Sequence, residues 1–65
     1  MGLTIDMKHI VHGPNNATNF TTQLLRLIFK ADQRNRAKLR REYPNAVMIV
    51  ETYQDTGEVL ELESD

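Results

Sequence analysis

The chain has 65 residues, a net charge of −1, no cysteine, and 40% hydrophobic residues. This length limits it to a single small domain, residues 1–65, whose interior is too small for a multistep enzyme with a cofactor cradle. Because cysteine is missing, disulfides, thiolate metal sites and cysteine nucleophiles are excluded together, and the composition fits a reducing, cytoplasmic environment.

The charged residues are sorted along the chain. Residues 26–41 contain seven of the eight basic side chains and one acid, Asp32, whereas residues 42–65 contain seven acids and no base. Opposite charges that lie close together in a fold lower its self-repulsion, so attraction between the two blocks is the simpler interpretation. The alternative is that the basic block forms an interaction surface.

Residues 3–9 alternate apolar and polar side chains with a period of two, which predicts a short extended segment with one buried side. Turn-forming residues at positions 12–16 would end this segment. Asp6, His9 and His12 would share a face on a helix and could hold a metal there, but in an extended segment the two histidines point to opposite faces. We therefore expect no metal site and no cofactor.

From Asn19 the apolar residues recur every three or four positions, which predicts a helix over residues 19–31. Asn19 or Thr18 is a suitable N-cap, because a short side-chain oxygen accepts from the free amides of the first turn. The predicted inner face consists of Phe20, Leu24, Leu27, Ile28 and Ala31, with Leu25 at its edge.

A second helix is predicted over residues 33–43, with Asp32 as its N-cap and Pro44 as its end. Its apolar side is thin and consists mainly of Leu39 and Tyr43. On the opposite side, three basic residues align at about 100° per residue, and a fourth joins them if the helix continues unbroken from the preceding one. We call these four residues the basic stripe: Lys30, Arg34, Lys38 and Arg41.

Residues 44–62 are compatible with two structures. As a third helix over 44–56, the segment has Pro44 in its first turn and Gly57 at its end, and Val47, Val50, Tyr53 and Gln54 would face inward. As a β-hairpin over 47–62, a β-branched run would pair with residues 59–62. We favour the helix. The predicted fold class is mainly α, a small three-helix unit with an extended N-terminal segment, and the alternative is α+β with the C-terminal hairpin.

A longer pattern supports the helical prediction. It reads Phe20-x3-Leu24-Leu25-x-Leu27-Ile28-x-Lys30-Ala31-Asp32-x2-Asn35-Arg36-x2-Leu39-x3-Tyr43-Pro44-x2-Val47-x2-Val50-x2-Tyr53. This pattern resembles that of small uncharacterised proteins of bacteriophages and integrated elements, in which a proline often stands where this chain has Gln33. The resemblance implies a compact helical unit and a mobile-element setting, and hence the cytoplasm of a host cell. It implies no activity.

The sequence offers no catalytic constellation. The only serine, Ser64, lies one residue from the end, and three isolated glycines make no phosphate-binding loop. No apolar run approaches the ~18 residues that span a bilayer. We expect neither an enzyme nor a membrane protein.

Apolar side chains that a small core does not accommodate tend to form a contact patch. The side chains that fall outside the predicted inner faces are the predicted protein-contact residues: Leu25, Phe29, Met48 and Ile49. We therefore expect a small intracellular protein-binding module with a protein partner or a second copy of the chain, such as a mobile-element inhibitor or adaptor acting on a host protein. The alternative is a nucleic-acid-binding protein whose basic stripe contacts phosphates in a salt-dependent manner.

Overall fold

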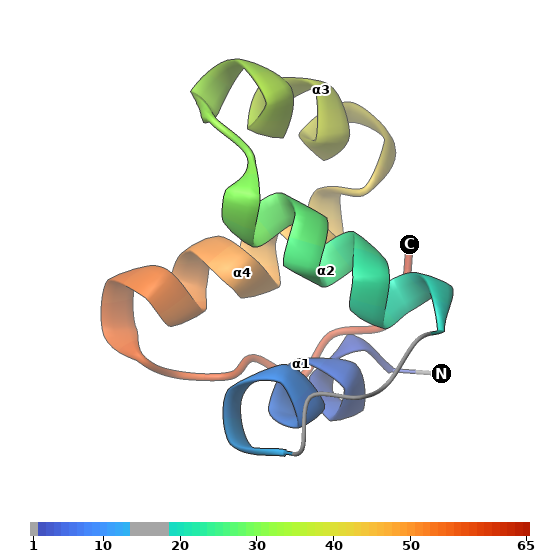
Figure 1. Cartoon of the computed structure of the whole chain (residues 1–65), viewed down its shortest axis with the longest axis vertical. Helices are drawn as coiled ribbons and strands as arrows, with labels where there is room; N and C mark the ends of the chain where they lie inside the picture. The colour runs from blue at the N-terminus through green and yellow to red at the C-terminus, as the bar shows by residue number, and fades with distance from the viewer. Residues whose placement is uncertain (1, 14–18) are drawn as a thin grey trace.

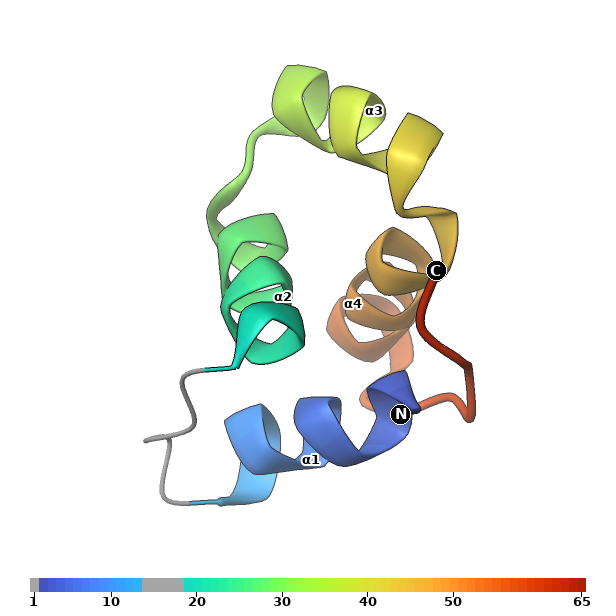
Figure 2. The ribbon, with the colours of Figure 1, turned by 90° about the vertical axis from the view of Figure 1, so that its right-hand side faces the viewer.

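The computed structural model describes residues 2–13 and 19–65, and this part of the chain forms four α-helices. They are α1 (Leu3–His12), α2 (Phe20–Lys30), α3 (Gln33–Glu42) and α4 (Pro44–Thr56) (Figure 1). In Figure 2, α2 and α4 lie next to each other, with α1 crossing below them and α3 above. Helix α4 packs against all three other helices. The mainly α class is confirmed, and the three predicted helices occur at nearly the predicted boundaries.

Local signals define the ends of these helices. The side chain of Asn19 accepts a hydrogen bond from the N–H of Thr22 (3.2 Å) and caps α2. Asp32 caps α3 in the same way, through the N–H of Asn35 (2.8 Å). Gly57 ends α4 in the left-handed conformation, with φ of +81°. The other cap candidate, Thr18, and positions 14–16 of the predicted turn lie outside the described residues.

The N-terminal segment is helical, so the prediction of an extended segment was wrong. In a segment of only seven residues, an alternating pattern also contains the four-residue spacing of a helix. Leu3 and Met7 have this spacing, and both are fully buried. Ile10 and Val11 continue the same face and pack against the core. A spacing of four and seven residues is that of an amphipathic helix, and packing against α2 and α4 selects it.

The hydrophobic core lies between α1, α2 and α4. It contains nine buried side chains: Leu3, Met7, Leu24, Leu25, Ile28, Ala46, Val47, Ile49 and Val50. Helix α3 contributes no buried residue and lies at one end of the molecule, at the top of Figure 1. Burial of one such aliphatic side chain stabilises a fold by about 1.5–3 kcal/mol, so most of the stability comes from these three helices.

A buried carboxylate joins α1 to the start of α2. Asp6 is 3% exposed, and its Oδ1 accepts hydrogen bonds from Asn19 Nδ2 (3.2 Å) and from the buried hydroxyl of Thr22 (3.3 Å). Both donors belong to the N-terminal turn of α2, where the helix dipole favours a negative charge. The polar residue inside the apolar pattern of α1 therefore has a structural role.

Residues 58–65 form an extended segment, which we call the C-terminal strap. It returns from the end of α4 along α1 to the start of α4 (Figure 2). The N–H of Leu3 donates to the carbonyl oxygen of Leu62 (2.8 Å). The hydroxyl of Thr4 donates to the carbonyl oxygen of Leu60 (2.8 Å). The alternative prediction of a hairpin over 47–62 was wrong, because its first strand lies within α4. The strap pairs with the N-terminus through one isolated bridge, between residues 2 and 63.

The strap also caps α4. This helix follows Tyr43, whose side chain makes no capping hydrogen bond. Instead, the carboxylate of Asp65 accepts from the N–H of Asn45 (2.8 Å) and from the N–H of Ala46 (3.0 Å). The last residue of the chain thus supplies the acceptors that the start of α4 lacks locally.

Candidate interaction surface

Two of the four predicted protein-contact residues are part of the core. Leu25 and Ile49 are both 0% exposed, so the prediction that they form a contact surface was wrong. Helix α4 packs against all three other helices, and α2 packs against both α1 and α4. Each of the two helices therefore buries a wider arc than the single face predicted for it.

The other two predicted contact residues are accessible to different degrees. Phe29 is half-buried against the core, and its ring meets that of Tyr53 edge-on, with ring centroids 6.3 Å apart. Met48 is 50% exposed. It borders a hollow that is otherwise lined by Arg40, Pro44, Glu51 and Thr52. Met48 is thus available for contact, but among mostly polar neighbours.

Two large apolar side chains of α2 that were predicted to face inward are exposed, so this prediction was wrong. Phe20 is 67% exposed and Leu27 is 53% exposed. The core takes the arc of α2 around Leu25 and Ile28, and this leaves the neighbouring arc of the same apolar helix in water. The sequence does contain a signal for this exposure, because four of the five residues from Leu24 to Ile28 are apolar. At 100° per residue they spread over an arc wider than one helix face. One face cannot hold them all.

A groove runs between α2 and α3. Its apolar lining comes from Leu27 and Ala31 on one side and Leu39 on the other, and its volume is about 500 Å³. Lys30 and Lys38 border it, one from each helix. We call it the α2–α3 groove and define it by Leu27, Lys30, Ala31, Asp32, Asn35, Lys38 and Leu39.

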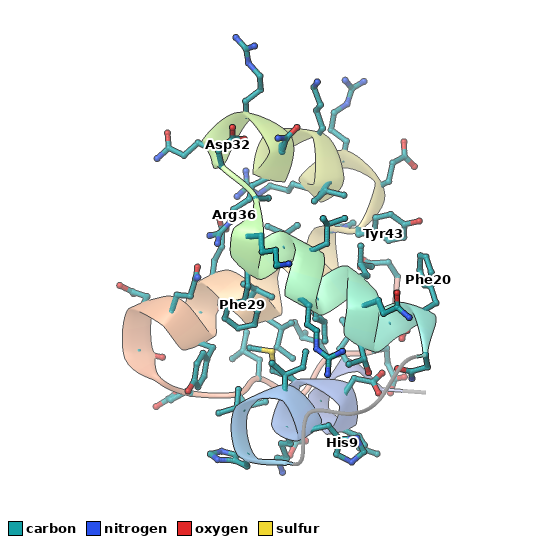
Figure 3. All side chains as sticks on the ribbon, viewed as in Figure 1. His9, Phe20, Phe29, Asp32, Arg36 and Tyr43 are labelled. Atoms are coloured by element: carbon teal, nitrogen blue, oxygen red, sulfur yellow. The ribbon has the colours of Figure 1, made fainter. Side chains whose placement is uncertain are left out.

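The apolar surface continues from this groove toward the start of α2. A neighbouring hollow is lined by Phe20, Gln23, Leu24 and Leu27. At that end the ring of Phe20 lies beside the ring of Tyr43, with centroids 6.2 Å apart (Figure 3). Aromatic and aliphatic side chains of α2 and α3 therefore form one connected surface.

The four residues of the basic stripe are all exposed. The chain breaks between the helices at residues 31–32, so Lys30 belongs to α2 and the other three to α3. Lys30 and Lys38 nevertheless both line the α2–α3 groove, whereas Arg34 and Arg41 do not. No acidic side chain among the described residues forms an ion pair with any of the four.

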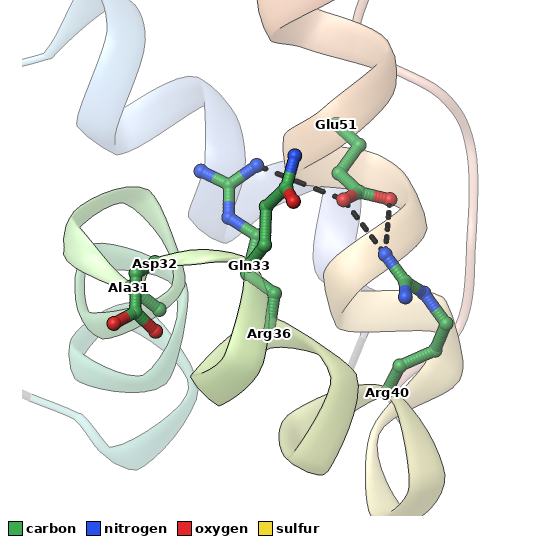
Figure 4. Close-up of a pocket in the computed structure, with 6 residues that line it drawn as sticks. All are labelled: Ala31, Asp32, Gln33, Arg36, Arg40 and Glu51. Carbon is green, nitrogen blue, oxygen red and sulfur yellow. Dashed lines mark hydrogen bonds and ion pairs between the residues drawn. The ribbon is translucent and has the colours of Figure 1, made fainter.

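Two other arginines of the basic block bind the acidic block (Figure 4). Arg40 Nη2 donates to both carboxylate oxygens of Glu51 (2.8 and 2.7 Å), and Arg36 Nη1 lies 3.7 Å from the same carboxylate. Arg36 also donates to the carbonyl oxygens of Ile28 (3.1 Å) and Phe29 (3.5 Å) at the end of α2. The simpler interpretation of the charge blocks therefore holds for these two arginines, which join α2, α3 and α4.

The histidines of α1 stand apart from this surface. His9 and His12 lie three residues apart on the helix, and both are exposed. Within residues 2–13 and 19–65, no three side chains of the metal-ligating types gather closely enough to bind a metal ion. In the same part of the chain, no helix combines the length and the apolar character needed to cross a membrane.

Comparison of the chain with protein-family models, with curated proteins and with solved structures gives no match. The functional assignment therefore depends on the exposed apolar and basic residues of α2 and α3.

Proposed function

We propose that the protein is a small protein-binding module whose contact surface is formed by α2 and α3. The observation that carries this proposal is the exposure of Phe20 and Leu27, two large apolar side chains that are more than half in water on one helix. Covering apolar surface gains about 25 cal/mol per Å². A partner that covers both side chains would remove their apolar surface from water, which the small core of this chain does not do.

The surroundings of these side chains support a specific contact. Phe20 and Leu27 are connected through Leu24, and Leu39 extends the apolar surface onto α3. Lys30 and Lys38 of the basic stripe border this surface. An apolar patch with a charged rim is typical of protein interaction sites, and unpaired charges on the rim raise the rate of encounter with a partner of opposite charge.

Nucleic-acid binding is the second candidate, favoured by the four exposed cations of the basic stripe. Two observations count against it. Arg36 and Arg40 are held by Glu51 and contribute little to a phosphate-binding surface. Leu27 lies next to Lys30 in the groove, so a phosphate backbone bound there would have to cover an apolar side chain.

The resemblance to small bacteriophage and integrated-element proteins extends the proposal to a setting. In that setting, a chain of this size acts in the cytoplasm of the host cell as an inhibitor or adaptor that occupies a surface of a host protein. A second copy of the chain is the other protein partner that would cover the same apolar surface.

Site-specific photo-cross-linking tests the proposal. A photoreactive amino acid replaces Leu27 in one variant. In the control it replaces Gln54 of α4, which was predicted to face inward but is exposed and lies outside the groove. Both variants are expressed in the organism that encodes the chain, and cross-linked proteins are identified by mass spectrometry. We expect a protein adduct at position 27 that is absent at position 54 and that disappears when Phe20 is changed to serine. Adducts to nucleic acid alone would contradict protein binding. Capture of the same proteins from both positions would contradict a contact surface at α2 and α3.

A further inference from the structure

We infer that the α2–α3 groove binds an acidic amphipathic helix of the partner, in which one apolar stripe is flanked on both sides by Asp or Glu. This inference rests on the proposed function and adds the chemistry of the partner segment to it. The α2–α3 groove and the adjoining hollow at Phe20 together extend from Phe20 to Lys30. This is ~15 Å along α2 at 1.5 Å per residue. That length matches about three turns of a partner helix, the size of segment used in helix-in-groove recognition.

Leu27 is the centre of this surface. It lines the α2–α3 groove of about 500 Å³ and also two adjoining hollows of about 300 and 330 Å³. One adjoining hollow leads toward Phe20 and the other toward Lys30. The hollow toward Phe20 also contains the apolar Leu24, whereas the hollow toward Lys30 contains Gln23 and Arg26. On the α3 side of Leu27, the α2–α3 groove adds Ala31 and Leu39. A partner helix that covers Leu27 and these two apolar parts needs apolar side chains three and four residues apart.

The charges beside the groove select an acidic segment. Lys30 projects from α2 and Lys38 from α3, so both edges of the groove are positive. The acid that also lines the groove, Asp32, is held as the N-cap of α3 by the N–H of Asn35 (2.8 Å). Since neither lysine has an ion-pair partner among the described residues, carboxylates on both flanks of the bound helix would complete the pairing.

The acidic part of this chain is engaged elsewhere in the molecule. The C-terminal strap alternates apolar and acidic residues, but its backbone is bound to Leu3 and Thr4 of α1. Its final carboxylate, that of Asp65, is bound to the start of α4. The strap is therefore held away from the groove and does not supply the acidic helix.

An unbiased peptide selection tests this inference. A displayed library of helical peptides with randomised exposed positions is selected against the full chain, and the enriched peptides are sequenced. We expect an apolar stripe with Asp or Glu on both flanks. Against the Lys30→Glu, Lys38→Glu double variant, the same library should instead enrich Lys and Arg at the flanking positions.

Matched variants then measure the contribution of each part of the groove. An enriched peptide should bind about tenfold more weakly to the double lysine variant, the size of effect expected for two exposed ion pairs, and its affinity for the wild type should fall with salt. Leu27→Asp should weaken binding by at least that factor. Arg34→Glu with Arg41→Glu makes the same change of charge on residues that do not line the groove, and should have a smaller effect. Circular dichroism checks that each variant is folded.

Several outcomes would overturn the inference. These are enrichment of basic or uncharged peptides, no enriched peptide at all, displacement of the peptide by an oligonucleotide, or a wild-type dimer that Leu27→Asp converts to a monomer. The last outcome would mean that a second copy covers the groove. If these results exclude an acidic helix while the cross-link at position 27 still captures a host protein, the inference alone is wrong. If that cross-link also fails, the proposed function falls with it.

Discussion

Replacing Asp65 with alanine should loosen the start of α4, although this residue is exposed and lies at the end of the chain. The amides of Asn45 and Ala46 donate to its two carboxylate oxygens, at 2.8 and 3.0 Å. No nearer side chain replaces these acceptors, because Tyr43 at the N-cap position makes no capping hydrogen bond. The variant therefore removes the cap of the helix that contacts all three others.

The size of the effect follows from two terms. Loss of an N-cap acceptor costs typically ~1 kcal/mol, and loss of a negative charge at a helix N-terminus costs about 0.3–1 kcal/mol. We expect the free energy of unfolding to fall by roughly 1.5 kcal/mol. In a domain of this size, 1 kcal/mol corresponds to about 4–8 °C, so Tm should fall by roughly 6–12 °C. Asp65→Asn keeps one acceptor oxygen but loses the charge. Its melting temperature should lie between those of the wild type and Asp65→Ala.

Thermal and urea unfolding followed by far-UV circular dichroism measure this change. The matched control is Glu61→Ala, which removes an exposed carboxylate from the same strap without removing a helix cap. We expect the control to change the free energy of unfolding by no more than about 0.5 kcal/mol. Equal melting temperatures for Asp65→Ala and Glu61→Ala would refute the capping role of the strap.

Four further substitutions test the packing and the end of α4. Ile49→Ala should cost about 2–5 kcal/mol, most of the stability of so small a domain, because it empties a fully buried position; an unchanged urea midpoint would contradict this burial. Arg36→Met should lower the urea midpoint more than Arg40→Met. The Arg36 side chain is 16% exposed and binds the end of α2, whereas that of Arg40 is 49% exposed. The opposite order would argue against a joining role of Arg36 between α2, α3 and α4. Gly57→Ala should cost ~1 kcal/mol in thermal unfolding, because a left-handed φ is unfavourable for a side chain; a stabilised variant would disprove that conformation.

Helix α2 serves the core and the candidate interaction surface with neighbouring residues. Leu25 is fully buried and Leu27, two positions further along, is more than half exposed. A polar substitution at Leu25 should therefore unfold the chain, whereas one at Leu27 should leave the fold intact and affect binding. This difference makes Leu27 the more informative position for functional experiments.

The sequence by itself determined the course of the chain from residue 19 to Gly57. The caps at Asn19 and Asp32, the proline at position 44 and the glycine at position 57 act within one helical turn. Such signals do not depend on what packs against the helix. The presence, type and approximate ends of α2, α3 and α4 could therefore be predicted, and so could the exposure of the basic stripe.

Only the tertiary structure decided which apolar residues are inside. A short alternating segment such as residues 3–9 has no strong preference of its own, and it is a helix because Leu3 and Met7 complete the core formed by α2 and α4. The same packing buried Leu25 and Ile49, left Leu27 in water, and brought Asp65 to the start of α4. Burial depends on contacts between residues far apart in the chain, and the period of a single helix does not contain that information.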